Sequence, residues 1–181
     1  MVASRTLVLG GARSGKSAHA EGLVAESARV TYVATARQDP ADREWAQRIA
    51  AHVARRPAHW RTVEAAGDDL RRALETAEPG ATVLVDDVAT WLTGVLDDAA
   101  AWERDPVALD AVAGCCTALV DAVARCSARL VLVSAEVGLG VVPATRSGRL
   151  FRDELGALNA RLADACDEVV LLVAGQPLRL R

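Results

Sequence analysis

The chain has 181 residues, 51% of them hydrophobic and 25% charged, and its formal net charge is −3. These values indicate a folded globular domain of ordinary size and exclude a disordered tail. The negative charge argues against a general nucleic-acid binder, and an aromatic content of 3% offers no stacking platform for single strands.

Short apolar runs alternate with longer helical segments along the chain. The runs are continuous and rich in β-branched residues, which is typical of strands covered on both faces. The alternation predicts an α/β fold with three layers and a mostly parallel central sheet, formed by a single domain over 1–181. Strands are expected at 5–10, 30–35, 82–87, 129–134 and 168–173. Helices are expected at 15–28, 40–55, 67–77, 89–101, 106–127 and 146–166, and turns or loops at 77–81 and 137–148.

The turn after the first expected strand carries a phosphate-binding pattern. It matches GxxxxGK[ST] in full through Gly10, Gly11, Ala12, Arg13, Ser14, Gly15, Lys16 and Ser17. The glycines allow backbone N–H groups to point inward at the positive end of the next helix, which makes an anion site. Lys16, the only lysine in the chain, is expected to reach the β and γ phosphates of a nucleoside triphosphate, and Ser17 to hold Mg²⁺. The alternative is an ordinary glycine-rich turn.

The segment 48–64, RIAAHVARRPAHWRTVE, joins a histidine to several arginines. His52 lies near the end of a helical stretch, and Arg55, Arg56 and Arg61 follow it. A neutral imidazole is a competent nucleophile near pH 7, and guanidinium groups beside it can hold a phosphate. On the residues alone, a histidine beside arginines more often forms an ordinary surface pair.

The expected strand at 82–87 ends in two carboxylates. Asp86 ends the apolar run. This is the position of the acidic residue that binds the metal ion beside a phosphate loop. Asp87 is expected to cap the following helix, and the alternative is that both residues only serve that helix start. The guanine-reading NKxD pattern is absent from the sequence, whose single asparagine is Asn159, and no protein-kinase signature is present.

The cysteines and the N-terminus bear on the compartment. Cys115, Cys116, Cys126 and Cys166 include no CxxC pair, so we expect four buried, reduced thiols as in a reducing cytosol. The first residues lack the layout of a signal peptide, and no apolar stretch is expected to approach the ~20 residues of a membrane helix. The sequence therefore predicts a cytoplasmic protein without membrane insertion.

Six blocks in order resemble a known family over nearly the whole chain. They are GGARSGKSAHAE, YVATA, RIAAHVARRPAHWRTVE, VLVDDVATWLT, VSAEVGLGVVP and GRLFRDELGALNARLADACDEVVLLVAGQPL. They are similar to the bifunctional adenosylcobinamide kinase / adenosylcobinamide-phosphate guanylyltransferase of cobalamin biosynthesis. The HxxxRPxxWRTxE and EVGxGxVP blocks are the specific part of this resemblance, because the phosphate loop alone is generic.

The resemblance implies two reactions at one site. A nucleoside triphosphate, ATP or GTP, phosphorylates adenosylcobinamide, and GMP is then transferred from GTP through a histidine-linked GMP. The position that matches this histidine is His52. The family also implies a small homo-oligomer, such as a trimer, and nucleotide contacts outside the phosphate loop at Ala34, Thr35, Ala36, Val53, Ala54, Arg55, Arg56, Glu64 and Asp86.

The chain departs from the family pattern at four positions, which are Ala135, Ala144, Gly94 and Ala160. None of them touches the phosphate loop or His52, so the expected effect is on corrinoid or subunit contacts. Two other functions stay open: a monofunctional P-loop kinase of a small molecule, in which His52 is structural, and a nucleotide-dependent binding module without turnover.

Overall fold

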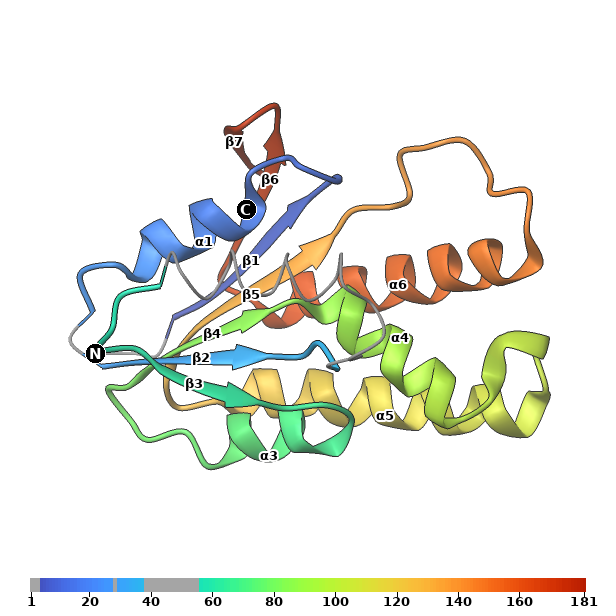
Figure 1. Ribbon diagram of the computed structural model, residues 1–181, viewed down its shortest axis with the longest axis horizontal. Helices are drawn as coiled ribbons and strands as arrows, with labels where there is room; N and C mark the ends of the chain where they lie inside the picture. Colours follow the sequence, from blue (N-terminus) through green and yellow to red (C-terminus); the bar gives the residue numbers. More distant parts are fainter. Residues whose placement is uncertain (1–3, 28, 38–55) are drawn as a thin grey trace.

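A seven-stranded sheet forms the centre of the protein, whose computed structural model describes residues 4–27, 29–37 and 56–181 (Figure 1). The strands lie in the order β3-β2-β4-β5-β1-β6-β7. All neighbours are parallel except β6 and β7, which are antiparallel. The bounds are β1 Arg5–Gly10, β2 Val30–Ala34, β3 Arg61–Glu64, β4 Thr82–Asp86, β5 Arg129–Ala135, β6 Glu168–Val173 and β7 Gln176–Arg179.

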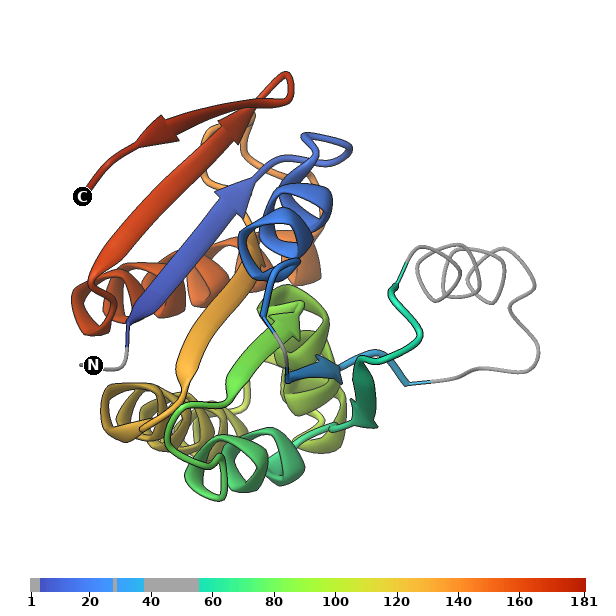
Figure 2. The same ribbon diagram turned by 90° about the vertical axis from the view of Figure 1, so that its left-hand side faces the viewer.

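Helices cover both faces of the sheet and give the three layers that the sequence predicts (Figure 2). One face carries α1, Lys16–Val24, over the middle strands. The other carries α3 Asp68–Glu75, α4 Val88–Asp98, α5 Pro106–Arg125 and α6 Arg146–Ala165, with a short 3₁₀ turn at Ala101–Glu103. The predicted helix at 40–55 lies outside the described residues.

The alternating faces of the strands explain why their apolar runs are continuous. In β1, Leu7 and Leu9 belong to the larger core beneath α3, α4, α5 and α6, whereas Val8 belongs to a smaller core with Ala20 and Val24 of α1. Successive side chains of a strand point to opposite faces, so a strand between two helical layers needs apolar residues at every position.

The sequence prediction missed two strands, and both lie at edges of the sheet. β3 has no buried residue over Arg61–Glu64, and β7 has four exposed residues that include Pro177. Neither segment shows the apolar run on which the prediction depended. Each becomes a strand only through pairing, β3 with β2 and β7 with β6.

Two expectations about α5 are wrong. We expect no apolar stretch of membrane-spanning length, but this helix is long and apolar enough, by length and composition, to cross a membrane. In the structure it packs between α3 and α6 as part of the helical layer. Cys115 on the same helix is exposed, whereas Cys116, Cys126 and Cys166 are buried. Consecutive helical residues point in directions about 100° apart, so Cys115 and Cys116 cannot both face the core. The predicted cap of α5 is confirmed: Asp105 accepts hydrogen bonds from the backbone N–H groups of Val107 and Ala108.

Candidate functional site

The phosphate loop connects the carboxyl end of β1 to the first turn of α1. Gly15 stands before the helix with a φ of 91°, a left-handed conformation that favours glycine. A Cβ added at Gly10 would lie 2.3 Å from the Ser14 Oγ, so no larger residue fits there without a shift of the loop. The loop therefore favours both glycines that the pattern specifies, Gly15 for its backbone conformation and Gly10 for the space that the Ser14 side chain occupies.

The loop is attached to the strands on either side of β1. The Glu136 N–H, just after β5, donates to the Gly10 carbonyl at 3.0 Å. The Gly175 N–H, in the turn between β6 and β7, donates to the Ser14 carbonyl at 3.1 Å. Within the loop, the Lys16 Nζ donates to the Gly11 carbonyl at 3.3 Å, which keeps the ammonium group over the loop.

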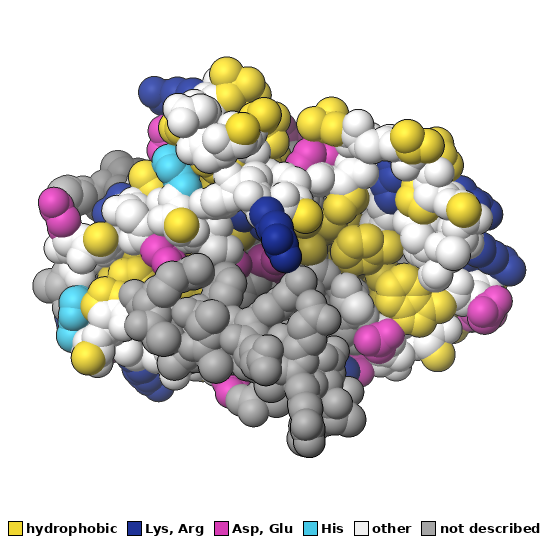
Figure 3. Space-filling model, turned by 45° about the horizontal axis from the view of Figure 1, so that its top comes forward, with side chains coloured by type: hydrophobic (Ala, Val, Ile, Leu, Met, Phe, Trp, Pro, Cys, Tyr) yellow, Lys and Arg dark blue, Asp and Glu magenta, His cyan; other side chains and the backbone are white. Residues whose placement is uncertain are grey.

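Asp86 stands at the end of β4 and faces the loop, as the sequence predicts. The Ser17 hydroxyl donates to the Asp86 Oδ1 at 3.2 Å, and the Tyr32 hydroxyl donates to the Oδ2 at 2.6 Å. Burial, followed by the nearby Asp86 carboxylate, raises the pKa of Tyr32, so its hydroxyl keeps its proton and acts as the donor. On the face seen in Figure 3, basic and acidic side chains meet near the centre of the molecule.

The oxygen donors of this site fit a magnesium ion. Mg²⁺ is commonly held by one or two protein oxygens while substrate phosphates and water complete its shell. The Ser17 hydroxyl, at the start of α1, and the Asp86 carboxylate, at the end of β4, are such oxygens, and they lie 3.2 Å apart. Within the described ranges, no group of three or more His, Cys, Asp or Glu residues could hold a metal ion on its own.

Asp87 caps α4, as the sequence predicts. Its Oδ1 accepts from the Thr90 N–H at 2.6 Å. Burial raises the pKa of the Asp87 carboxyl. The Thr35 hydroxyl, itself buried, donates to the Asp87 carbonyl at 2.7 Å and accepts from the Asp87 N–H at 3.0 Å. Thr35 thus fixes the backbone that follows Asp86.

The sheet register brings several predicted residues to one edge. Glu64, Ala34 and Asp86 stand directly opposite one another across β3, β2 and β4. Ala36 follows β2 at the same edge. The Arg56 guanidinium lies instead over the ring of Tyr32, with its Cζ 3.4 Å from the ring centre. The predicted residues His52, Val53, Ala54 and Arg55 lie outside the described residues.

Tyr32 is the site residue that sequence reasoning missed. It is the only tyrosine of the chain and lies two positions before the end of its strand, within the apolar run VTYVAT. A lone hydroxyl in such a run is a usable signal, because a buried tyrosine needs a polar partner. What could not be inferred was the register that pairs Tyr32 with Leu84 of β4, two residues before Asp86.

Of the four departures from the family pattern, Ala135 stands directly opposite Gly10 of the phosphate loop, in contrast to the expectation that none lies beside the loop. Ala135 ends β5, and its carbonyl accepts from the Asn159 amide at 3.0 Å. A Cβ at Gly94 would lie 3.4 Å from the Arg37 guanidinium. The Ala144 carbonyl accepts from Arg149 in the loop before α6, and Ala160 is exposed on α6.

Comparisons with known proteins agree with this geometry. The family model described as cobinamide kinase / cobinamide phosphate guanyltransferase matches residues 6–180. The chain is 44% identical to the bifunctional adenosylcobalamin biosynthesis protein CobP of Pseudomonas aeruginosa, over 98% of this chain and 97% of the relative. It is 42% identical to CobU of Escherichia coli K12, which carries the same description, over 97% of this chain and 98% of the relative.

A solved structure from Pyrococcus horikoshii OT3 shares the fold. Its TM-score is 0.50 at 8% identity, covering 98% of this chain and 86% of the other. That likeness supports the architecture alone, whereas the sequence matches extend over nearly the full length. The chain belongs to the cobinamide kinase / cobinamide phosphate guanyltransferase family.

Proposed function

We propose that this chain phosphorylates adenosylcobinamide with a nucleoside triphosphate and then joins GMP from GTP to the phosphate. The observation that carries the proposal is the contact between Ser17 and Asp86, 3.2 Å long, beside the loop that bears Lys16. This arrangement suits a triphosphate with its metal ion, and membership of the family supplies the two reactions.

In the first reaction the corrinoid hydroxyl oxygen bonds to the γ-phosphorus, the bond to the β-phosphate oxygen breaks, and the hydroxyl proton is released. The loop from Gly10 to Ser17 binds the phosphates, and Lys16 neutralises charge that grows on the leaving oxygen. Ser17 and Asp86 hold Mg²⁺, which supplies electrostatic stabilisation of the phosphoryl oxygens when it is bound. ATP and GTP both fit this role.

In the second reaction a His52 imidazole nitrogen bonds to the α-phosphorus of GTP, and pyrophosphate leaves. A phosphate oxygen of the corrinoid then attacks the same phosphorus, and the bond to His52 breaks. A covalent intermediate divides one difficult displacement into two easier ones. Val53, Ala54, Arg55, Arg56 and Glu64 line the nucleotide in this proposal, together with Ala34, Thr35 and Ala36. The working form is a cytoplasmic homo-oligomer.

The test is transfer of label from α-³²P-GTP to the protein. We expect the wild-type chain to form an adduct that is labile in acid and stable in base, as a phosphoramidate is. His52→Ala should form no adduct while still phosphorylating cobinamide. His59→Ala is the matched control, because it removes an exposed histidine from the same segment, and it should label normally.

The opposite pattern supports the alternative function. If His52→Ala labels as the wild type does, or if the wild type makes only the phosphorylated corrinoid, the chain is a monofunctional kinase and His52 is structural. If GTP binds but no corrinoid product forms, the chain is a nucleotide-dependent binding module.

A further inference from the structure

The two oxygens of the Asp86 carboxylate have different partners. Oδ1 accepts from the Ser17 hydroxyl at 3.2 Å, and Oδ2 accepts from the Tyr32 hydroxyl at 2.6 Å. The second contact is the shorter one, and it comes from a side chain that is only 1% exposed. A donor fixed in the core therefore holds one oxygen while the other faces the start of α1.

The ring of Tyr32 has little freedom to move. It stacks on Trp60, with the ring centres 6.4 Å apart and the planes at 27°. The Arg56 guanidinium covers the ring with its Cζ 3.4 Å from the ring centre. The ring also belongs to the core beneath α1, together with Val24 and Leu84. These contacts fix the direction in which the hydroxyl points.

We infer that Tyr32 is a positioning residue for the metal-binding carboxylate of Asp86. By holding Oδ2, it sets the rotation of the carboxylate so that Oδ1 faces the Ser17 hydroxyl. These two oxygens would hold the metal of a bound triphosphate. The inference rests on the proposed function, since that function gives Asp86 and Ser17 their metal. A partner that orients a metal ligand contributes to metal affinity without touching the metal.

Tyr32 also contacts Arg56, which belongs to the segment 48–64 that bears His52. Arg56 stands four residues after His52 in the sequence, and its guanidinium lies over the same ring whose hydroxyl donates to Asp86. One side chain therefore contacts both that segment and the carboxylate of the phosphate site. Tyr32→Phe separates the two contacts, because it removes the hydroxyl and keeps the ring beneath Arg56.

The test is GTP binding by Tyr32→Phe, measured by calorimetry with excess Mg²⁺ and again with EDTA. We expect the gain in affinity that Mg²⁺ gives to fall by about tenfold, the lower end of the range for losing such a partner. Affinity in EDTA should be unchanged, because the phosphate loop is intact. In the kinase assay, the Mg²⁺ concentration for half-maximal rate should rise, while kcat at saturating Mg²⁺ stays close to that of the wild type.

Thr82→Val is the matched control. It removes another buried hydroxyl from β4, at the opposite end of the strand from Asp86, and should leave the Mg²⁺ dependence unchanged. The inference is overturned if Tyr32→Phe responds to Mg²⁺ as the wild type does. It is also overturned if affinity falls equally in EDTA, or if Thr82→Val shows the same loss, since those results indicate general damage to the fold.

Failure of the proposed function looks different. In that case the wild-type chain makes no phosphorylated corrinoid and no labelled adduct, whatever the behaviour of Tyr32→Phe in the binding experiment. A Mg²⁺-dependent gain that Tyr32→Phe loses would then still support the positioning role of Tyr32 at a nucleotide site of another activity.

Discussion

Lys16 and Ser17 are neighbours in sequence, yet their side chains have different partners. The ammonium of Lys16 lies over the loop through its contact with Gly11, whereas the Ser17 hydroxyl turns to Asp86. Consecutive residues at a helix start point in different directions, so one turn can present a cation to phosphate and a hydroxyl to a metal. The pattern GxxxxGK[ST] predicts both roles because the spacing fixes both directions.

Replacing Lys16 by alanine should reduce the kinase rate by about 10²–10³, the scale of losing one preorganised electrostatic contact. The loss should lie mainly in kcat, because the charge on the leaving oxygen grows in the transition state. Steady-state kinetics with adenosylcobinamide and a triphosphate measure it. Arg125→Ala is a control, since it removes an exposed cation at the last turn of α5, outside the phosphate loop. Turnover of Lys16→Ala at the wild-type rate would contradict the assigned role.

The four thiols should differ sharply in reactivity. Burial raises the pKa of Cys116 to about 11 and that of Cys166 to about 12, and it raises the pKa of Cys126 as well. The thiolate is the reactive form, so these three should stay slow in the native protein up to pH 9. A disulfide reagent should modify one thiol per chain quickly, and Cys115→Ser should remove that phase. Four fast thiols before unfolding would show that the buried cysteines are accessible.

The turn between β6 and β7 links an edge of the sheet to the phosphate loop. Ala174 and Gly175 both have positive φ values, 49° and 78°, as two-residue hairpin turns require. The turn directs the Gly175 N–H to the Ser14 carbonyl. The β6–β7 hairpin therefore contacts the phosphate loop through its turn, although its second strand is exposed and carries no core residue.

Gly175→Ala should weaken nucleotide binding several-fold, because a side chain at a φ of 78° costs on the order of 1 kcal/mol and the turn relaxes by moving its N–H. Binding of GTP by calorimetry measures the effect. Gly80→Ala is matched, with a φ of 80° and open space around the added Cβ, in a turn before β4. It should lower the free energy of unfolding by a similar amount and leave GTP affinity unchanged. Equal affinities of the two variants would dismiss the contribution of the turn.

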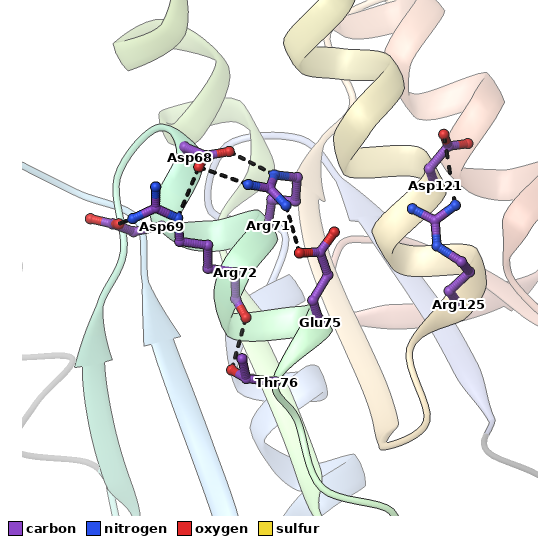
Figure 4. A network of polar contacts seen from close by, with 8 residues as sticks. All are labelled: Asp68, Asp69, Arg71, Arg72, Glu75, Thr76, Asp121 and Arg125. Atoms are coloured by element: carbon purple, nitrogen blue, oxygen red, sulfur yellow. Dashed lines mark hydrogen bonds and ion pairs between the residues drawn. The ribbon is translucent and has the colours of Figure 1, made fainter.

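A network of charged side chains lies on the surface of α3 (Figure 4). Arg71 donates to Asp68 at 2.7 Å and to Glu75 at 2.5 Å, one helical turn to either side, and Arg72 pairs with Asp68. Such exposed pairs contribute little to the stability of a helix, because water and salt screen them. The network supports the outer surface of α3, while its buried Leu70 and Leu74 attach the helix to the core.

At the scale of the whole molecule, the sheet order decides where chemistry can occur. β1 and β4 both lie beside β5 and run parallel to it, so the phosphate loop after β1 and Asp86 at the end of β4 lie at the same carboxyl-terminal side of the sheet. The sequence predicts the five central strands because each is a continuous apolar run. The row formed by Glu64, Ala34 and Asp86 could not be predicted, since it depends on β3, whose residues carry no apolar signal.

The candidate site, too, could be predicted from the sequence only in part. Asp87 caps α4 and Ser17 lies beside Asp86, as local pattern predicts, because strand ends and helix starts are local features. The roles of Ser17 and Asp86 as metal ligands stay predictions. The contacts of Tyr32 with Asp86 and Arg56 arise between segments far apart in the chain, so no local pattern specifies them. The roles of Lys16 and His52 in catalysis stay predictions.

An ion pair joins Arg5, the first residue of β1, to Asp167, the residue before β6. Its contribution to stability should depend on pH. Asp167 accepts from the Arg5 backbone N–H at 2.8 Å and from its guanidinium at 3.2 Å, and these hydrogen bonds lower the pKa of the Asp167 carboxyl. A carboxyl with a lowered folded-state pKa stabilises the fold above its unfolded pKa of about 3.9 and loses that contribution as the pH falls further.

Asp167→Asn should therefore lower the free energy of unfolding at pH 7 by at most about 1 kcal/mol, since the pair is partly exposed to solvent. The difference from the wild type should shrink below about pH 4, where protonation of Asp167 removes the same charge. Urea titrations from pH 3 to pH 7 measure both quantities. A difference that grows in acid would contradict the assigned cause.

The two attachments of the phosphate loop, through Glu136 on one side and Gly175 on the other, bear on the thermodynamics of ligand capture. A glycine-rich segment loses much conformational entropy when it is ordered, and here the ordering is completed during folding. A polyphosphate that binds here would meet a loop that is already ordered, so less of its interaction energy would be lost to ordering the loop.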